Sequence, residues 1–284
     1  MSEADSFAQL KRSLPIQERV TAAVEFLNSS ASDEALKRAL AACLELCSDG
    51  KVQQHDLKLL VSKVLCLWAK VFQRAESMQG LAHKLEWKMD EDYSEARHMA
   101  GLLLDLMGYL PIQQVESALR EGLSLADQRL KMFAALSLLR QLQPVDPDEL
   151  EKTAASHEVR ILLWEQLRLQ NMDWLMPKAW SGREMLAASE LSRWVAHPME
   201  LGIPPEEIEL MGIFPETTDA GLADVFLFRF REYPKPWEPG EGWKAGIAGW
   251  YREGNAIGSC WSAFENWHSR SPEEHFRKLQ GNIF

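Results

Sequence analysis

The chain has 284 residues, of which 46% are hydrophobic and 26% are charged, and its formal net charge is −11. This composition is typical of a soluble globular protein with a sizeable core and argues against a disordered chain. The acidic balance, without any basic stripe, argues against nucleic-acid binding. No apolar run is long enough to cross a bilayer, and the first residues lack a secretory signal. We therefore expect a cytoplasmic protein that does not bind membranes.

The first two hundred residues predict one helix after another. Apolar residues recur at helical spacing, and Pro, Ser, Asp and Gly residues mark the helix starts and ends. The predicted helices run from Pro15 past Leu27, over 33–48 and 53–78, from the acidic residues 90–92 to 106, and over 112–121, 126–142, 147–155, 157–170 and 182–196. Short turns between helices of this length are typical of antiparallel helix pairs.

The composition changes after residue 200, where ten of the sixteen glycines and five of the eleven tryptophans lie. Alternating residues predict a strand over 222–231, and 243–251 and 256–261 are two further candidate strands, with a turn at 253–255. Ser271 is expected to cap a closing helix that begins at Pro272. Together these elements predict a small α+β module, which needs another element to pack against.

A short phrase recurs within the helical region: a small or aliphatic residue, then Lys or Arg, then an Ala/Leu-rich stretch that ends in Leu. The basic residues of its four copies are Lys37, Arg97, Lys131 and Arg160. They follow one another at about sixty and then twice at about thirty residues, and repetition on this scale is typical of a solenoid. The segment 182–196 has Glu184 in the basic position, as expected of a modified terminal repeat.

The copies Glu158-Val159-Arg160 and Glu95-Ala96-Arg97 resemble the second helix of HEAT-like repeats of the short bacterial kind, over about residues 30–195. The resemblance implies a mainly α fold, a right-handed α-α superhelix of HEAT-like helix pairs over 1–200, with the α+β module over 201–284 packed on it. It also implies that the four basic residues make polar contacts between neighbouring units. The core residues expected on this basis are Leu44, Ala100, Leu104, Ala134, Leu138, Leu163 and Leu167. An irregular helical bundle is the alternative.

No residue pattern in the chain predicts catalysis, a metal site or a cofactor. Cys43 and Cys47 share a helix face, but no second ligand pair accompanies them and Cys66 stands alone, so we interpret Cys43 and Cys47 as core residues. Residues His83, Asp90, Asp92 and His98 are interpreted as a solvated acidic loop and its surroundings. Cys260 has only His268 nearby in sequence, and the paired glutamates 206–207 and 273–274 have no distinguishing feature.

Tryptophan is concentrated in the second half of the chain. Most of these residues are expected to join the α+β module to the last helices, while exposed ones are candidate contacts for a partner. Trp237 and Trp243 flank the Pro-Gly loop and are the best candidates for partial exposure. The candidate partner-binding residues are Trp237, Trp243, Trp164 and Trp194.

These observations favour a non-enzymatic scaffold or adaptor that binds another protein, with basic surface, in an acidic concave groove. One alternative is an immunity or inhibitor protein that neutralises a basic toxin or enzyme. A second is a DNA-repair glycosylase, since some HEAT-like proteins of this length excise damaged bases with a basic groove, a Trp and an Asp; the missing basic stripe disfavours it. A third is a protein that binds a small ligand between the array and the module.

Overall fold

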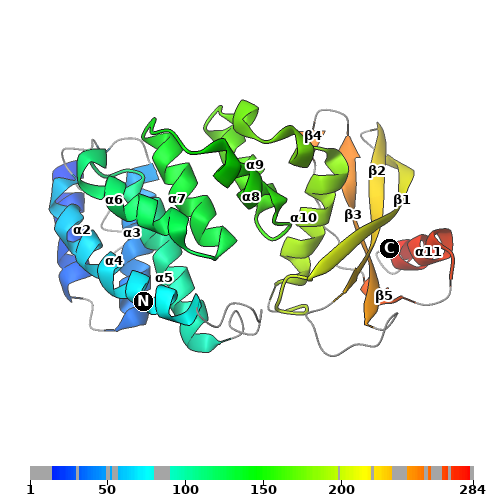
Figure 1. The fold of residues 1–284 in the computed structure, drawn as a ribbon, viewed down its shortest axis with the longest axis horizontal. Helices are drawn as coiled ribbons and strands as arrows, with labels where there is room; N and C mark the ends of the chain where they lie inside the picture. Colours follow the sequence, from blue (N-terminus) through cyan, green and yellow to red (C-terminus); the bar gives the residue numbers. More distant parts are fainter. Residues whose placement is uncertain are drawn as a thin grey trace. The chain divides into compact units, whose positions relative to one another are not determined.

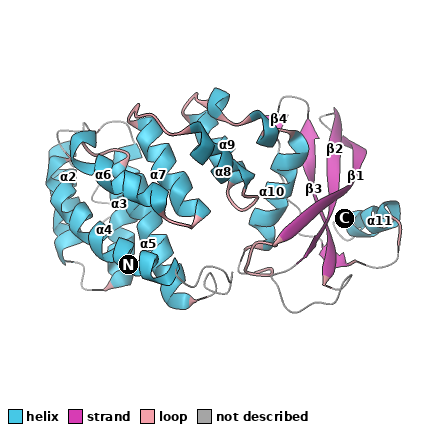
Figure 2. Cartoon of the chain, in the orientation of Figure 1, coloured by secondary structure: helices cyan, strands magenta, loops and turns pink. Residues whose placement is uncertain are grey.

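A computed structural model describes residues 15–29, 32–48, 52, 57–79, 90–197, 199–218, 221–231, 242–252, 255–256, 264–267 and 270–281. The fold is mainly helical with a small antiparallel sheet near the C-terminus (Figures 1 and 2). The chain divides into two compact units, Met1–Leu150 and Glu151–Phe284. The division falls inside a helix, and it differs from the boundary at residue 200 that the change in composition predicted.

The first unit consists of helix pairs. Its helices are α2 (Ile16–Ser29), α3 (Asp33–Ser48), α4 (Lys58–Gln79), α5 (Glu91–Met107), α6 (Ile112–Ser124), α7 (Gln128–Arg140) and the start of α8 (Pro147–Ala155). Consecutive helices pair as α2 with α3, α4 with α5 and α6 with α7. Helices α3, α5 and α7 also contact one another in series, as do α2, α4 and α6. The pairs therefore stack in two layers (Figure 1).

One continuous apolar core lies between the two layers and runs from Val20 in α2 to Leu138 in α7. All the predicted core residues are buried except Leu44, which is half-buried against this core. The other predicted helix limits are confirmed to within three residues, most clearly for α3, because capping residues mark them, whereas residues 53–56 of the helix predicted over 53–78 lie outside the described residues. Ser32 Oγ accepts a hydrogen bond from the Ala35 amide at 3.2 Å at the start of α3.

The second unit places helices on both faces of a sheet. After the end of α8 come α9 (Arg160–Leu169), the short 3-10 helices η2 (Asp173–Leu175) and η3 (Lys178–Trp180), and α10 (Arg183–Val195). The strands are β1 (Glu207–Thr218), β2 (Gly221–Arg231), β3 (Trp243–Arg252), β4 (Asn255–Ala256) and β5 (Phe264–Asn266), followed by α11 (Pro272–Gly281). The strand order is β1-β2-β3-β4, β5 also pairs with β3, and all pairings are antiparallel.

Alternate residues of β2 face opposite helices. Phe226 and Phe228 pack with Leu191 of α10 on one face of the sheet. Val225 and Leu227 pack with Phe276 and Leu279 of α11 on the other face. Helix α10, which the sequence assigned to the repeat array, is thus the support that the sheet requires, and this packing explains why the second unit begins before residue 200.

The strands predicted over 222–231 and 243–251 are confirmed as β2 and β3. Of the strand predicted over 256–261, only residue 256 is described, within β4, and the remainder lies outside the described residues. Strand β1 was not predicted. A register shift between Leu210 and Gly212 interrupts its alternation of inward and outward residues, and Pro215 lies within it, which is a residue that sequence patterns count against a strand.

Candidate functional site

The recurring basic residues join successive helices of the stack. Within the first unit, each ammonium or guanidinium group binds a carboxylate on a later helix or at its cap. The pairs are Lys37 with Glu95 at 3.2 Å, Arg97 with Asp127 at 2.6 Å, and Lys131 with Glu149 at 3.2 Å. These ion pairs agree with the role expected of the basic residues, which is to make polar contacts between neighbouring helix pairs.

Arg160 plays the same part in the second unit without a carboxylate. Its side chain is buried, and it donates to the carbonyl oxygens of Ala154 at 2.7 Å, Ala155 at 2.7 Å and Met185 at 2.9 Å. It also lies 4.6 Å from the ring centre of Trp180. Burial lowers the pKa of this guanidinium to about 10, so the group is still charged at neutral pH and complements the C-terminal carbonyls of α8.

Asp127 is a buried carboxylate with several hydrogen-bond donors around it. It is fully buried and caps α7 by accepting from the amides of Arg129 at 2.8 Å and Leu130 at 3.1 Å. The same carboxylate accepts from the Tyr93 hydroxyl at 3.0 Å and from Nε of Arg97 at 2.6 Å. Four donors therefore fix the start of α7 against α5.

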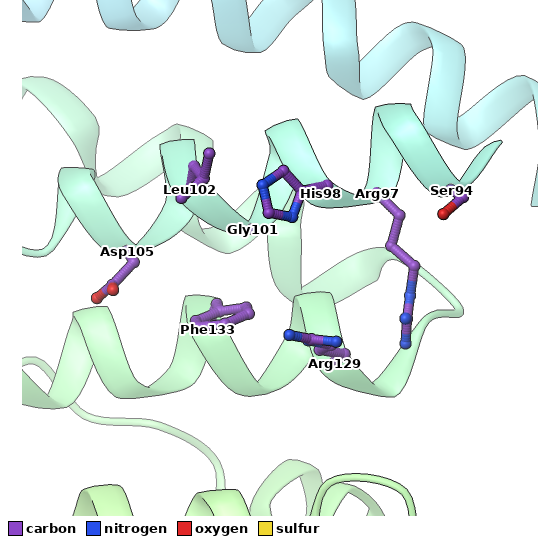
Figure 3. Close-up of a pocket in the computed structure, with 8 residues that line it drawn as sticks. All are labelled: Ser94, Arg97, His98, Gly101, Leu102, Asp105, Arg129 and Phe133. Atoms are coloured by element: carbon purple, nitrogen blue, oxygen red, sulfur yellow. The ribbon is translucent and has the colours of Figure 1, made fainter. Parts of the chain in front are cut away.

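A pocket of about 200 Å³ opens between α5 and α7. Its lining residues are Ser94, Arg97, His98, Gly101, Leu102, Asp105, Arg129 and Phe133 (Figure 3). The residues from α5 recur at helical spacing on one face of that helix, while the intervening Ala96, Met99 and Leu103 are buried. We call the surface formed by Ser94, His98, Leu102, Asp105, Arg129 and Phe133 the α5–α7 face.

Gly101 determines the depth of the pocket. A Cβ atom at this position would lie 3.2 Å from the Phe133 ring, closer than ordinary van der Waals contact. The missing side chain therefore lets Phe133 of α7 lie against the backbone of α5, and the ring forms an apolar wall. In Figure 3 Phe133 and Arg129 lie side by side on α7, with the Arg129 guanidinium carbon 6.0 Å from the ring centre.

The charged residues of the lining are spread along the pocket. In Figure 3 Arg97 lies near Ser94 at one end, Arg129 lies below His98 in the middle, and Asp105 lies at the opposite end. Asp105 is held by Arg140, with Nη1 2.9 Å from Oδ1. The lining thus contains two arginines and one aspartate, a balance opposite in sign to that of the whole chain.

His98 responds to this environment. Its pKa lies below its ordinary value, mainly because burial disfavours the imidazolium and further because Lys37 and Arg129 are positively charged neighbours. Glu34 opposes this shift to a smaller extent. The imidazole is therefore neutral at pH 7 and has both a donor and an acceptor nitrogen.

Of the predicted tryptophans, the structure describes Trp164, Trp194 and Trp243. Trp164 and Trp194 are half-buried against the core between α10 and the sheet, and Trp194 lies 5.8 Å from Phe264, measured between ring centres. This is the packing role expected of most tryptophans. Trp243 is half-buried on β3, with the guanidinium groups of two β2 arginines over its ring at 4.6 and 5.0 Å. Trp237 lies outside the described residues.

The cysteine interpretation is confirmed for two residues. Cys43 and Cys47 are buried in the core of the first unit, and burial raises the pKa of the Cys47 thiol to about 12. Cys66 is exposed on α4. Cys260, His268 and His83 lie outside the described residues. Within the part of the chain that the structure describes, no group of three or more His, Cys, Asp or Glu side chains could hold a metal ion.

The pocket was not predicted, although the sequence contains one feature that points to it. Two close copies of the repeated phrase have Glu two residues before the basic residue, at Glu95 and Glu158, whereas the copy at Lys131 has Arg129 there. That departure places an additional positive charge on α7 beside α5. The pocket itself depends on the packing of two helices about thirty residues apart, which periodicity does not reveal.

No protein-family model matches the chain, and neither the curated proteins nor the solved structures contain a significant match. None of the helices within the described ranges combines the length and the apolar character needed to traverse a membrane.

Proposed function

We propose that this protein is a non-catalytic interaction scaffold, a superhelix of HEAT-like helix pairs that binds a segment of another protein on its α5–α7 face. The observation that carries the proposal is the recurring ionic contact between successive helices. It uses Lys37, Arg97 and Lys131 to fix the stack. A stack fixed in this way offers a rigid, preorganised surface, which lowers the entropic cost of binding a partner.

The other candidate functions receive less support from particular residues. A groove for a basic toxin or enzyme needs concentrated negative charge, but the pocket lining has two arginines and one aspartate. A repair glycosylase needs a basic groove beside its Trp, but the chain carries a net charge of −11. The two Trp residues considered for that role, Trp164 and Trp194, are half-buried against the core between α10 and the sheet. A small anionic ligand suits the pocket chemically, and we treat it as the second candidate.

Site-specific photo-crosslinking tests the scaffold proposal. A photoreactive phenylalanine analogue replaces Ser94, which is exposed at the rim of the pocket, in the full chain expressed in its own host. The matched control places the same analogue at Ser117, an exposed serine of α6 in the other layer. The proposal predicts a discrete protein adduct from position 94 and none from position 117. Equal labelling from both positions, or no protein adduct from position 94, contradicts it.

A further inference from the structure

The pocket on the α5–α7 face combines the groups that recognise an oxyanion. Arg129 supplies a guanidinium fork that matches the planar geometry of a carboxylate or a phosphate. The Ser94 hydroxyl at one end of the pocket and the His98 ring in its middle (Figure 3) supply further donors. Arg97 also lines the pocket, and its charge is paired with the buried Asp127.

The remaining lining suits the aliphatic stem of a side chain. Phe133, Leu102 and Gly101 form an apolar surface beside the charged end. The volume of about 200 Å³ is smaller than the roughly 300–1,000 Å³ of pockets that hold drug-sized ligands. A single acidic side chain of a bound polypeptide therefore matches both the size and the polarity of the pocket.

We propose that this pocket binds the oxyanion group of one acidic side chain, a carboxylate or a phosphate ester, in a segment of the partner protein. The assignment rests on the proposed scaffold function and specifies the chemistry of the partner. It differs from the basic partner that the net charge of −11 suggested. Local potential at a pocket depends on the nearest charged groups more than on distant screened ones. Among the charged lining residues, Arg97 is paired with Asp127 and Asp105 is paired with Arg140, so Arg129 is the main source of positive potential.

The test uses small probes and the full chain. N-acetylglutamate amide and N-acetylphosphoserine amide represent the two sources of the oxyanion, and N-acetylglutamine amide is the neutral isostere. Binding is followed by NMR through the His98 imidazole protons and the backbone amides of α5 and α7. We expect saturable shifts at millimolar concentration with an anionic probe and none with the neutral one. The anionic probe that binds more tightly identifies the source.

Two substitutions separate the site from general charge effects. Arg129→Gln is expected to weaken binding of the anionic probe about tenfold, the loss expected for one charge-assisted contact. The matched control is Arg120→Gln on α6, an exposed arginine paired with Glu116 at 2.9 Å, which should leave the affinity within about twofold. His98→Gln gives a second variant at the pocket and should weaken binding without unfolding the chain.

Three results would overturn the assignment. These are no shifts at about 50 mM probe, equal losses from Arg129→Gln and Arg120→Gln, and tighter, steeply salt-dependent binding of a DNA duplex at the same residues. The scaffold function is judged separately by crosslinking. An adduct from position 94 that forms equally well in the Arg129→Gln chain removes the anion assignment and leaves the scaffold. Probe binding without any adduct removes the scaffold.

Discussion

Asp127 shows how one buried carboxylate combines two structural roles. It caps α7 through two backbone amides and ties that helix to α5 through Tyr93 and Arg97. A capping residue on a surface helix is worth about 1 kcal/mol. Removing one partner of a buried ion pair costs more, because the remaining charge is left without compensation.

We therefore expect Asp127→Ala to lower the free energy of unfolding by about 3–5 kcal/mol, measured by urea denaturation. The control is Glu116→Ala, which removes an exposed carboxylate of α6 that pairs with Arg120. Its effect should be within about 0.5 kcal/mol. Similar losses from both substitutions would show that Asp127 has no special part in holding α5 and α7 together.

The cysteines give a prediction about reactivity. Cys47 is buried and its thiol pKa is raised to about 12, so the reactive thiolate is scarce at pH 8. Cys66 is exposed on α4. Alkylation of the folded chain followed by mass spectrometry should label Cys66 and leave Cys43 and Cys47 unmodified until the chain is unfolded. Rapid labelling of Cys47 in the folded chain would contradict its place in the core.

His98 makes stability depend on pH in a defined direction. Burial, Lys37 and Arg129 lower its pKa in the folded chain, against the opposing effect of Glu34, whereas the unfolded value is about 6.5. Between the two values the unfolded chain binds more protons, so the contribution of His98 to stability decreases as pH falls below about 6.5. As pH falls through this window, the unfolding free energy of the unsubstituted chain should fall relative to that of His98→Gln. A difference between the two chains that stays constant with pH would contradict the lowered pKa of His98.

At the scale of the helices, Arg160 is a buried arginine whose guanidinium donates to backbone carbonyl oxygens. It connects the end of α8 to α10 through carbonyl oxygens alone. Arg160→Met is expected to lower the free energy of unfolding of the second unit by about 2–4 kcal/mol, because buried carbonyl groups lose their donors. Amide hydrogen exchange should rise at the end of α8 and at the start of α10.

The matched control for this substitution lies on the same helix. Arg168 is exposed and stacks on Trp164, with its guanidinium carbon 4.6 Å from the ring centre. Arg168→Met should cost only about 0.5–1 kcal/mol. If the two substitutions cost the same, the contacts of Arg160 contribute no more than an exposed stacking pair.

The elements differ in how far the sequence predicts them. Helix limits were predicted well because caps and periodicity are local signals, as at Ser32 and at Ser271, whose hydroxyl accepts from the Glu274 amide at 3.3 Å. Strand β1 was missed because its register shift at Leu210 removes the alternation on which strand prediction depends. Local sequence signals indicate the intrinsic preference of a segment for helix or strand. They do not indicate an irregularity, such as the register shift in β1, that depends on packing.

At the scale of the whole molecule, the sequence predicted a helical array over 1–200 and a module over 201–284, whereas the structure divides into compact units at residue 150 because α10 packs against the sheet. The candidate site was not predicted. Net charge averages over the surface, whereas the pocket depends on where Arg97 and Arg129 meet across two helices. The overall acidity therefore indicated a basic partner, whereas we propose an acidic segment for the pocket.

We propose that the partner binds on the α5–α7 face. Amide hydrogen exchange, measured on the full chain alone and in complex with the partner captured from position 94, tests it most directly. In the complex we expect slower amide exchange in α5 and α7, around Ser94, His98 and Arg129. Exchange in α2, α4 and α6 should be unchanged. Slower exchange confined to α6 or to the sheet of the second unit, with α5 and α7 unaffected, would contradict it.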